Sequence, residues 1–200
     1  KGYIYVDTGA MYRGLAIHFL KKGIQPDEKE KIIDACKDAE VSIGYEDGAQ
    51  QIYLNGENIT SMLREEAVGN MASISSAVPE VRAKLLDLQR NLAKEKDVVM
   101  DGRDIGTTVF PNAQIKVFMT ASLEVRARRR YDEMVAKGEK PDLEQVAANL
   151  QERDYIDSHR STSPLKQAAD AFVLDNSQMS MGEELAWLRG VVQGKFGIYD

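Results

Sequence analysis

The chain has 200 residues, which is enough for one substantial hydrophobic core with insertions but too few for two large independent domains. Its net charge of −6 argues against a surface built to hold a nucleic-acid backbone. The one cysteine, Cys36, excludes an internal disulfide framework, and two distant histidines, His18 and His159, leave no Cys/His metal site.

Short apolar runs with β-branched residues alternate with long amphipathic stretches, a pattern typical of strands joined by helices over a parallel sheet. Strands are predicted at residues 3–7, 97–101, 114–121 and 171–175, the last three as buried strands. Helices are predicted at residues 11–23, about 80–96, 122–137, 142–160 and 180–193, with Gly23 at a C′ position, Pro79 in a first turn and Ser122 at an N-cap. The predicted fold class is α/β, with a parallel β-sheet flanked by helices.

Two segments depart from this simple alternation. Residues 41–60 alternate with period two and contain Asp47-Gly48 and Asn55-Gly56, which are typical of hairpin turns. This segment predicts a small antiparallel insert. Residues 122–160 carry two predicted helices joined by AKGEKPD, a glycine and proline break suited to a hinge.

Charged residues cluster where predicted strands end, which is the edge at which open parallel sheets bind ligands. Asp7 closes the first predicted strand, a few residues before Arg13. Asp101 closes the second strand and is followed closely by Arg103 and Asp104. Each aspartate by itself is equally compatible with helix capping or turn formation. Arginines combined with carboxylates suit a ligand that is anionic and also offers hydrogen-bond donors, as a nucleotide does.

The predicted helix at 142–160 adds charges on one face. Arg153, Asp157 and Arg160 fall at i, i+4 and i+7 and therefore share a helical face. A solvated ladder of ion pairs would have the same spacing. The turn STSPL that follows leads back towards the core and favours an inward orientation of this face.

The predicted helix at 122–137 carries a basic stripe on one side, formed by Arg126, Arg129 and Arg130. A solvated stripe matched by neighbouring acids is the alternative interpretation. Because no aromatic residues interleave with it, a nucleic-acid patch is not favoured. No Ser-His-Asp or Cys-His arrangement is evident either, but phosphoryl transfer needs only positioning and charge neutralisation.

Four long motifs, taken together, resemble the bacterial cytidylate kinases in order and across essentially the whole chain. They are YVDTGAMYRG, DGRDIGTTVFPNAQIKVFMTAS, RARRRYDE and RDYIDSHRSTSPLKQAADAFVLD. The resemblance implies a P-loop nucleoside monophosphate kinase fold with a helical lid, and transfer of the γ-phosphoryl group of ATP to CMP or dCMP with Mg²⁺. The predicted insert is similar to the extra lobe of the bacterial type.

The resemblance also implies roles for individual residues. The α-phosphate of CMP would be held by Arg13, Arg103, Arg153 and Arg160, and the acceptor nucleotide would also contact Thr8. The cytosine ring would be read by Ser73, Arg82 and Asp104, and the ribose hydroxyls by Asp157. Candidate catalytic residues are Arg103 and Arg153 together with the lid arginines Arg126, Arg129 and Arg130. Asp101 is a candidate for holding Mg²⁺ through water, with capping as its alternative role.

The implied organisation has five parts. They are a core at 1–40, a small β insert or NMP-binding lobe at 41–65, NMP-binding helices and core strands at 66–121, a lid at 122–160, and a C-terminal core strand and helix at 161–200.

One family motif is missing from these 200 residues, namely the phosphate-binding loop Gly-x-x-x-x-Gly-Lys-Ser/Thr. In the family it precedes the strand that ends in DTGAMYR. Residues 190–195, GVVQGK, have the wrong spacing and lie late in a predicted helix. We expect a segment of about one strand and one helix to precede Lys1. By themselves, the 200 residues are expected to contain a CMP site without an ATP site.

We expect a cytoplasmic monomer that binds CMP, dCMP and ATP, without nucleic-acid or membrane partners. Cysteine usage fits a reducing compartment, and no apolar run approaches the roughly 20 residues that cross a bilayer. Two alternatives remain open. One is a noncatalytic nucleotide-binding protein, and the other is a nucleoside monophosphate kinase that acts on UMP or AMP.

Overall fold

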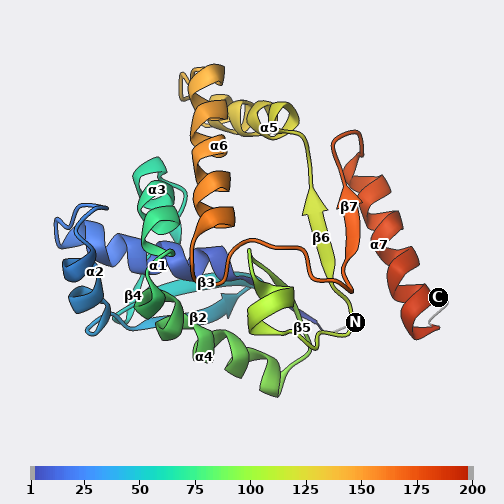
Figure 1. Ribbon diagram of the computed structural model, residues 1–200, viewed down its shortest axis with the longest axis horizontal. Coiled ribbons are helices and arrows are strands. Elements are labelled where there is room, and N and C mark those ends of the chain that lie inside the picture. The colour runs from blue at the N-terminus through green and yellow to red at the C-terminus, as the bar shows by residue number, and fades with distance from the viewer. Residues whose placement is uncertain (1–2, 198–200) are drawn as a thin grey trace. The chain divides into compact units, whose positions relative to one another are not determined.

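The computed structural model describes residues 3–197, which group into two compact units. The first unit extends through Phe110 and includes Tyr155–Lys166, and the second unit comprises Pro111–Asp154 and the residues from Gln167 onward. Both units mix helices with strands, as the predicted α/β class requires (Figure 1). Among residues 3–197, no helix combines the length and apolar character needed to cross a lipid bilayer.

The first unit is built on a pair of parallel strands. β1 (Ile4–Asp7) pairs with β5 (Val98–Asp101), so that the strands end side by side at Asp7 and Asp101. The helices of this unit are α1 (Thr8–Lys21), α2 (Lys29–Cys36), α3 (Glu66–Ser75) and α4 (Pro79–Glu95), followed by a π-helical turn at Ile105–Val109. The core lies around α1, where Met11, Leu15 and Phe19 are fully buried.

The antiparallel insert is confirmed. It consists of β2 (Val41–Glu46), β3 (Ala49–Leu54) and β4 (Glu57–Asn58), which form one sheet beside α1 (Figure 1). Both predicted hairpin turns adopt positive φ angles at both positions, 50° and 79° at Asp47-Gly48 and 49° and 82° at Asn55-Gly56. A tight hairpin turn of this kind requires positive φ at both central residues. Asp, Asn and Gly adopt positive φ with less steric strain than other residues, which is why these dipeptides favour the turn.

The second unit contains another parallel pair. β6 (Val117–Thr120) pairs with β7 (Phe172–Asp175), and the helices are α5 (Leu123–Ala136) and α7 (Met181–Phe196). α6 (Leu143–His159) contributes residues to both units. The Ser122 hydroxyl accepts a hydrogen bond from the Val125 amide, which confirms the predicted N-cap.

The prediction that three strands are buried is wrong. Val99 and Met119 are 56% and 54% exposed, and Val173 is 50% exposed. In the first unit, Val6 and Met100 face the core, whereas their neighbours Tyr5 and Val99 face outward. Continuous apolar runs suggested burial on both faces, but in the first unit only the face of the strand pair that carries Val6 and Met100 packs against the core.

The bounds of two helices were not predicted from the sequence, although the implied organisation has helices in both regions. α2 has eight residues, and α3 contains Gly69 in its interior. Neither helix begins with a side-chain N-cap hydrogen bond. Short length, a glycine and the missing cap remove the local signals by which a helix is recognised. Tertiary packing provides the stability that local signals do not, since Val68 and Met71 of α3 are buried in the core.

Candidate functional site

The site in the first unit begins where β1 and β5 end. The Asp7 carboxylate accepts a hydrogen bond from the Ala10 amide at 3.1 Å and so caps α1. The Gln50 side chain of the insert holds the Asp7 backbone, accepting from its N–H at 2.8 Å and donating to its carbonyl at 3.1 Å. The insert therefore fixes the end of the strand from which the site residues follow.

The end of β5 is held just as tightly. The Thr8 hydroxyl donates to the Asp101 carbonyl at 2.7 Å, and the Tyr5 hydroxyl donates to the Asp101 carboxylate at 2.7 Å. A Cβ atom at Gly102 would lie 2.4 Å from the Thr8 hydroxyl oxygen. Glycine at position 102 thus permits the close approach that puts Arg103 and Asp104 beside α1.

The surroundings of Asp101 raise the pKa of its carboxyl. Although the residue as a whole is exposed, partial desolvation of its carboxyl raises the pKa, and the nearby Asp7 charge raises it further. The Tyr5 hydroxyl and the guanidinium groups of Arg103 and Arg13 act in the opposite direction. Arg13 and Arg103 therefore both lie within electrostatic reach of the two strand ends.

A second layer of the site is buried. Arg82, on α4, forms an ion pair with Asp104, and the two residues are 6% and 5% exposed. The Arg82 guanidinium also donates to the Ser76 carbonyl at 3.2 Å and lies 5.2 Å from the centre of the Tyr12 ring. Contacts on three sides fix its orientation.

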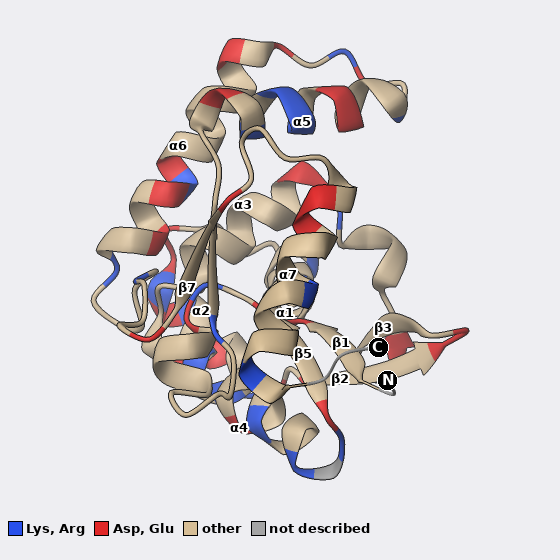
Figure 2. Cartoon of the chain, turned by 90° about the vertical axis from the view of Figure 1, so that its right-hand side faces the viewer, with Lys and Arg blue, Asp and Glu red and all other residues tan. Residues whose placement is uncertain are grey.

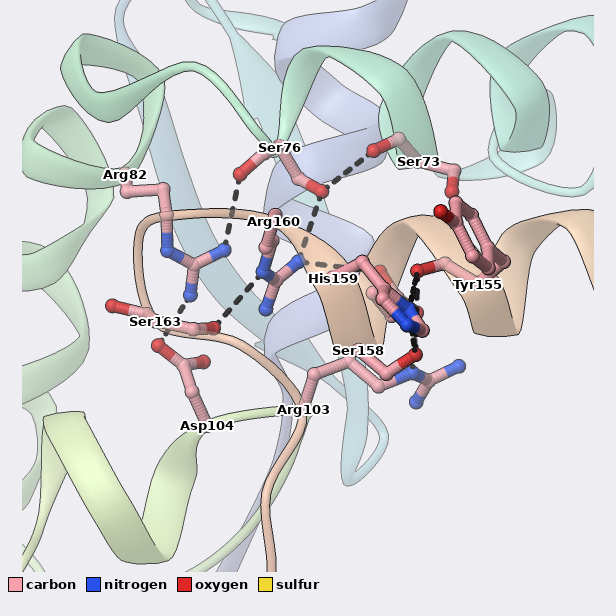
Figure 3. Close-up of polar contacts among 11 residues, drawn as sticks. Ser73, Ser76, Arg82, Arg103, Asp104, Tyr155, Ser158, His159, Arg160 and Ser163 are labelled. Carbon is pink, nitrogen blue, oxygen red and sulfur yellow. Dashed lines mark hydrogen bonds and ion pairs between the residues drawn. The ribbon is translucent and has the colours of Figure 1, made fainter.

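Arg160 continues this layer from the end of α6 (Figure 3). Its guanidinium donates to the Asp157 carboxylate and the Ser76 hydroxyl, both at 3.2 Å, and to the Ser163 carbonyl at 2.9 Å. Asp157 also accepts from Arg103 at 3.0 Å. Burial and the neighbouring Arg82 lower the pKa of Arg160, while the carboxylate of Asp157 raises it.

Some hydrogen-bonding groups of this layer have no partner. Among residues 3–197, the buried atoms Ser73 Oγ, Arg82 Nε and Arg160 Nη2 make no hydrogen bond. Such groups cost free energy unless something satisfies them. Three guanidinium groups, from Arg82, Arg103 and Arg160, also face only two paired carboxylates, Asp104 and Asp157. The site is therefore suited to an anion that accepts hydrogen bonds.

The structure gathers nine of the predicted residues in the first unit, namely Thr8, Arg13, Ser73, Arg82, Asp101, Arg103, Asp104, Asp157 and Arg160. The other four, Arg126, Arg129, Arg130 and Arg153, belong to the second unit.

The lid arginines have local partners in the second unit. Arg126 forms an ion pair with Asp154 at 2.7 Å. Arg129 donates to the side chain and carbonyl of Asn176. Arg130 pairs with Glu133 one turn later on α5, where basic and acidic segments adjoin (Figure 2). Part of the stripe is thus neutralised locally, as its alternative interpretation expects.

Sequence reasoning missed several residues that shape the site. Ser76 joins Arg82 to Arg160, and Gln50 and Tyr5 hold the strand ends. Ser76 lies three residues after Ser73, so helical spacing placed it on the same face. Nothing local marks Gln50 or Tyr5, because their partners are 43 and 96 residues away.

An α/β unit in which arginines and aspartates from separate segments meet beside the ends of parallel strands defines a protein that binds a phosphorylated small molecule. Comparison with known proteins narrows this class. The family model described as cytidylate kinase matches residues 1–188. The chain belongs to the cytidylate kinase family, which makes it a nucleotide kinase and a transferase.

Relatives named cytidylate kinase match most of the chain. The protein of Bacteroides thetaiotaomicron is 44% identical over 192 residues, which cover 94% of this chain and 84% of the relative. The protein of Flavobacterium johnsoniae is 47% identical over 189 residues, covering 92% and 82%. The protein of Caldicellulosiruptor bescii is 43% identical over 184 residues, covering 92% and 81%.

Proposed function

We propose that this protein transfers the γ-phosphoryl group of ATP to CMP or dCMP and so produces CDP or dCDP. Family membership and the names of the relatives support this activity. The structural observation that best supports this activity is the buried layer of Arg82, Asp104, Asp157 and Arg160. Within the described residues, Arg82 Nε and Arg160 Nη2 of this layer make no hydrogen bond. CMP offers the phosphate, the hydroxyls and the base edge that such a layer can bind.

Base selection follows from the donors and acceptors of Asp104, Arg82 and Ser73. Cytosine presents an amino donor at N4 beside acceptors at N3 and O2. Asp104 accepts from N4, while Arg82 or Ser73 donates to the ring acceptors. Uracil replaces the N4 donor with an acceptor, which faces the Asp104 carboxylate without a hydrogen bond, at a cost of about 1–3 kcal/mol. Specificity for cytosine thus results from this mismatch.

The arginines hold the attacking group. In this proposal the α-phosphate of CMP is held by Arg13, Arg103, Arg153 and Arg160, with Thr8 contacting the acceptor nucleotide and Asp157 accepting from the ribose hydroxyls. The positive charges offset repulsion between two polyanions. Arg126, Arg129 and Arg130 are proposed to approach the transferring phosphoryl group with Arg103 and Arg153 when the lid excludes water.

The family implies ATP as co-substrate, and we propose Mg²⁺ as the accompanying ion. Among residues 3–197 no three His, Cys, Asp or Glu side chains form a metal site. Mg²⁺ is commonly bound by one or two carboxylates and by substrate phosphates, with water completing its shell. The Asp101 carboxylate beside Asp7 fits that mode, and the ion would neutralise phosphate charge. We further propose a cytoplasmic monomer without nucleic-acid or membrane partners.

A phosphorylation assay with the full-length protein tests the proposal directly. CMP, dCMP, UMP and AMP are compared at equal concentration with ATP and Mg²⁺. We expect CMP and dCMP to have the highest kcat/KM, with UMP about 10- to 100-fold lower. A preference for AMP or UMP contradicts the base assignment. CMP binding by calorimetry without any transfer identifies the noncatalytic alternative.

A further inference from the structure

Ser76 lies where α3 ends and connects residues from three separate segments. Its hydroxyl accepts a hydrogen bond from Arg160 Nη1 at 3.2 Å and donates to the Ser73 carbonyl at 2.8 Å. Its own carbonyl accepts from Arg82 Nη1 at 3.2 Å. Figure 3 shows these contacts converging on one residue, with Arg82 at its backbone carbonyl and Arg160 and Ser73 at its hydroxyl. Ser76 is thereby linked to a residue 84 positions away in the sequence.

Burial makes the Ser76 hydroxyl important for the orientation of the Arg160 guanidinium. Ser76 and Arg160 are 6% and 8% exposed, so little water is present to replace a lost contact. Arg160 Nη2 already has no partner among the described residues. Without the Ser76 hydroxyl, Nη1 would keep only its contact with Asp157. The guanidinium would then lose one of the three groups that set its orientation.

We infer that Ser76 is a positioning residue, whose hydroxyl holds Arg160 in the orientation that binds the phosphate of CMP. The inference rests on the proposed function, which assigns Arg160 to that phosphate. Arg82 contacts the Ser76 backbone, so a change of side chain at position 76 leaves the contact on the base-reading arginine in place. The Ser76 hydroxyl also donates to the backbone carbonyl of Ser73 and not to its side chain, so no side chain assigned to the base loses a contact. The effect of Ser76 is therefore on the phosphate and not on the base.

The neighbouring Ser75 provides a matched control. Its hydroxyl is also buried, but it has no hydrogen-bond partner among residues 3–197. Ser73 and Ser76 are three residues apart and share a helical face, whereas Ser75 points to another side. Ser75→Ala and Ser76→Ala thus remove the same atom one residue apart, and only Ser76→Ala removes a contact of Arg160.

The test is calorimetric titration of the full-length protein with CMP and with cytidine, which lacks the phosphate. For Ser76→Ala we expect the Kd for CMP to rise about three- to tenfold, as the loss of one hydrogen bond of ordinary strength implies. The Kd for cytidine should stay within about twofold of that of the unmodified protein. Ser75→Ala should leave both constants unchanged.

The outcomes separate this inference from the proposed function. If the unmodified protein binds CMP no more tightly than cytidine, the phosphate site itself is refuted. If it discriminates normally but Ser76→Ala binds CMP as tightly as before, the positioning role is refuted. An equal loss of CMP and cytidine affinity indicates a general structural role and also overturns the inference.

A second variant covers the case in which Ser76→Ala unfolds. Ser76→Cys is nearly isosteric, and its thiol is a much weaker hydrogen-bond acceptor. Urea unfolding monitors the stability of each variant. Ser76→Cys is expected to raise the Kd for CMP selectively, by less than Ser76→Ala, and an unchanged Kd contradicts the inference.

Discussion

The ion pair between Arg82 and Asp104 is almost completely removed from water. Burying two charges is costly, and the attraction between them offsets that cost only when geometry and further hydrogen bonds are favourable. Arg82 has such support from the Ser76 carbonyl and the Tyr12 ring. The pair therefore stabilises the fold as long as both partners are present, and it fixes the two side chains that we propose to read the base.

Asp104→Ala is expected to lower the free energy of unfolding by about 3–5 kcal/mol, because it leaves the Arg82 charge buried and unpaired. Urea unfolding followed by circular dichroism measures the change. The exposed pair of Asp34 and Lys37 supplies the control, and Asp34→Ala should cost less than about 1 kcal/mol. Equal effects of the two variants would mean that the buried pair adds nothing beyond a surface pair.

At the scale of elements, α1 and the segment after α2 are joined by charges around Asp38. Its carboxylate lies 2.5 Å from Lys22 Nζ and 3.1 Å from His18 Nε2, both on or next to the last turn of α1. His18 is buried, whereas Asp38 is exposed. The hydrogen bonds from Lys22 and then His18 lower the pKa of Asp38 to about 2.

This shift predicts a pH dependence of stability. A carboxyl whose pKa is lower in the folded state than its ordinary value of 3.8 stabilises the fold above that value. The contribution is lost as the pH falls towards about 2. The difference in unfolding free energy between the unmodified protein and Asp38→Asn should therefore shrink between about pH 6 and about pH 3. Urea titrations across that range measure it, and a constant difference would contradict the assignment.

At the scale of the whole molecule, a substrate that binds only the folded state must stabilise it. The nine predicted residues of the first unit come from segments spread between Thr8 and Arg160. Unfolding of that unit separates them and abolishes the proposed CMP site. CMP binding and folding are thus thermodynamically linked, without any requirement for ATP.

CMP at about 100 times its Kd is expected to add about 2.7 kcal/mol to the unfolding free energy. For a chain of 200 residues this corresponds to a rise in Tm of roughly 5–10 °C. Differential scanning calorimetry with and without CMP measures the shift. UMP at the same concentration should raise Tm by clearly less, and an equal rise would argue against base recognition by Asp104.

The sequence by itself determined the features that depend on neighbours along the chain. Asp47-Gly48 and Asn55-Gly56 specify hairpin turns, and Ser122 specifies a helix start, because φ angles and caps involve only a few residues. The motifs also determined the family. Helical spacing placed Asp157 and Arg160 on one face, and they do contact each other.

Only the tertiary structure decided which distant groups meet. The contacts of Ser76 with Arg160 and of Gln50 with Asp7 join residues far apart in sequence, and no local pattern encodes such partners. The exposed faces of Tyr5 and Val99 likewise depend on which helices cover the strand pair, not on the apolar run itself. Local conformation is set by short-range sterics and hydrogen bonds, whereas burial and partner choice are set by packing of the folded chain.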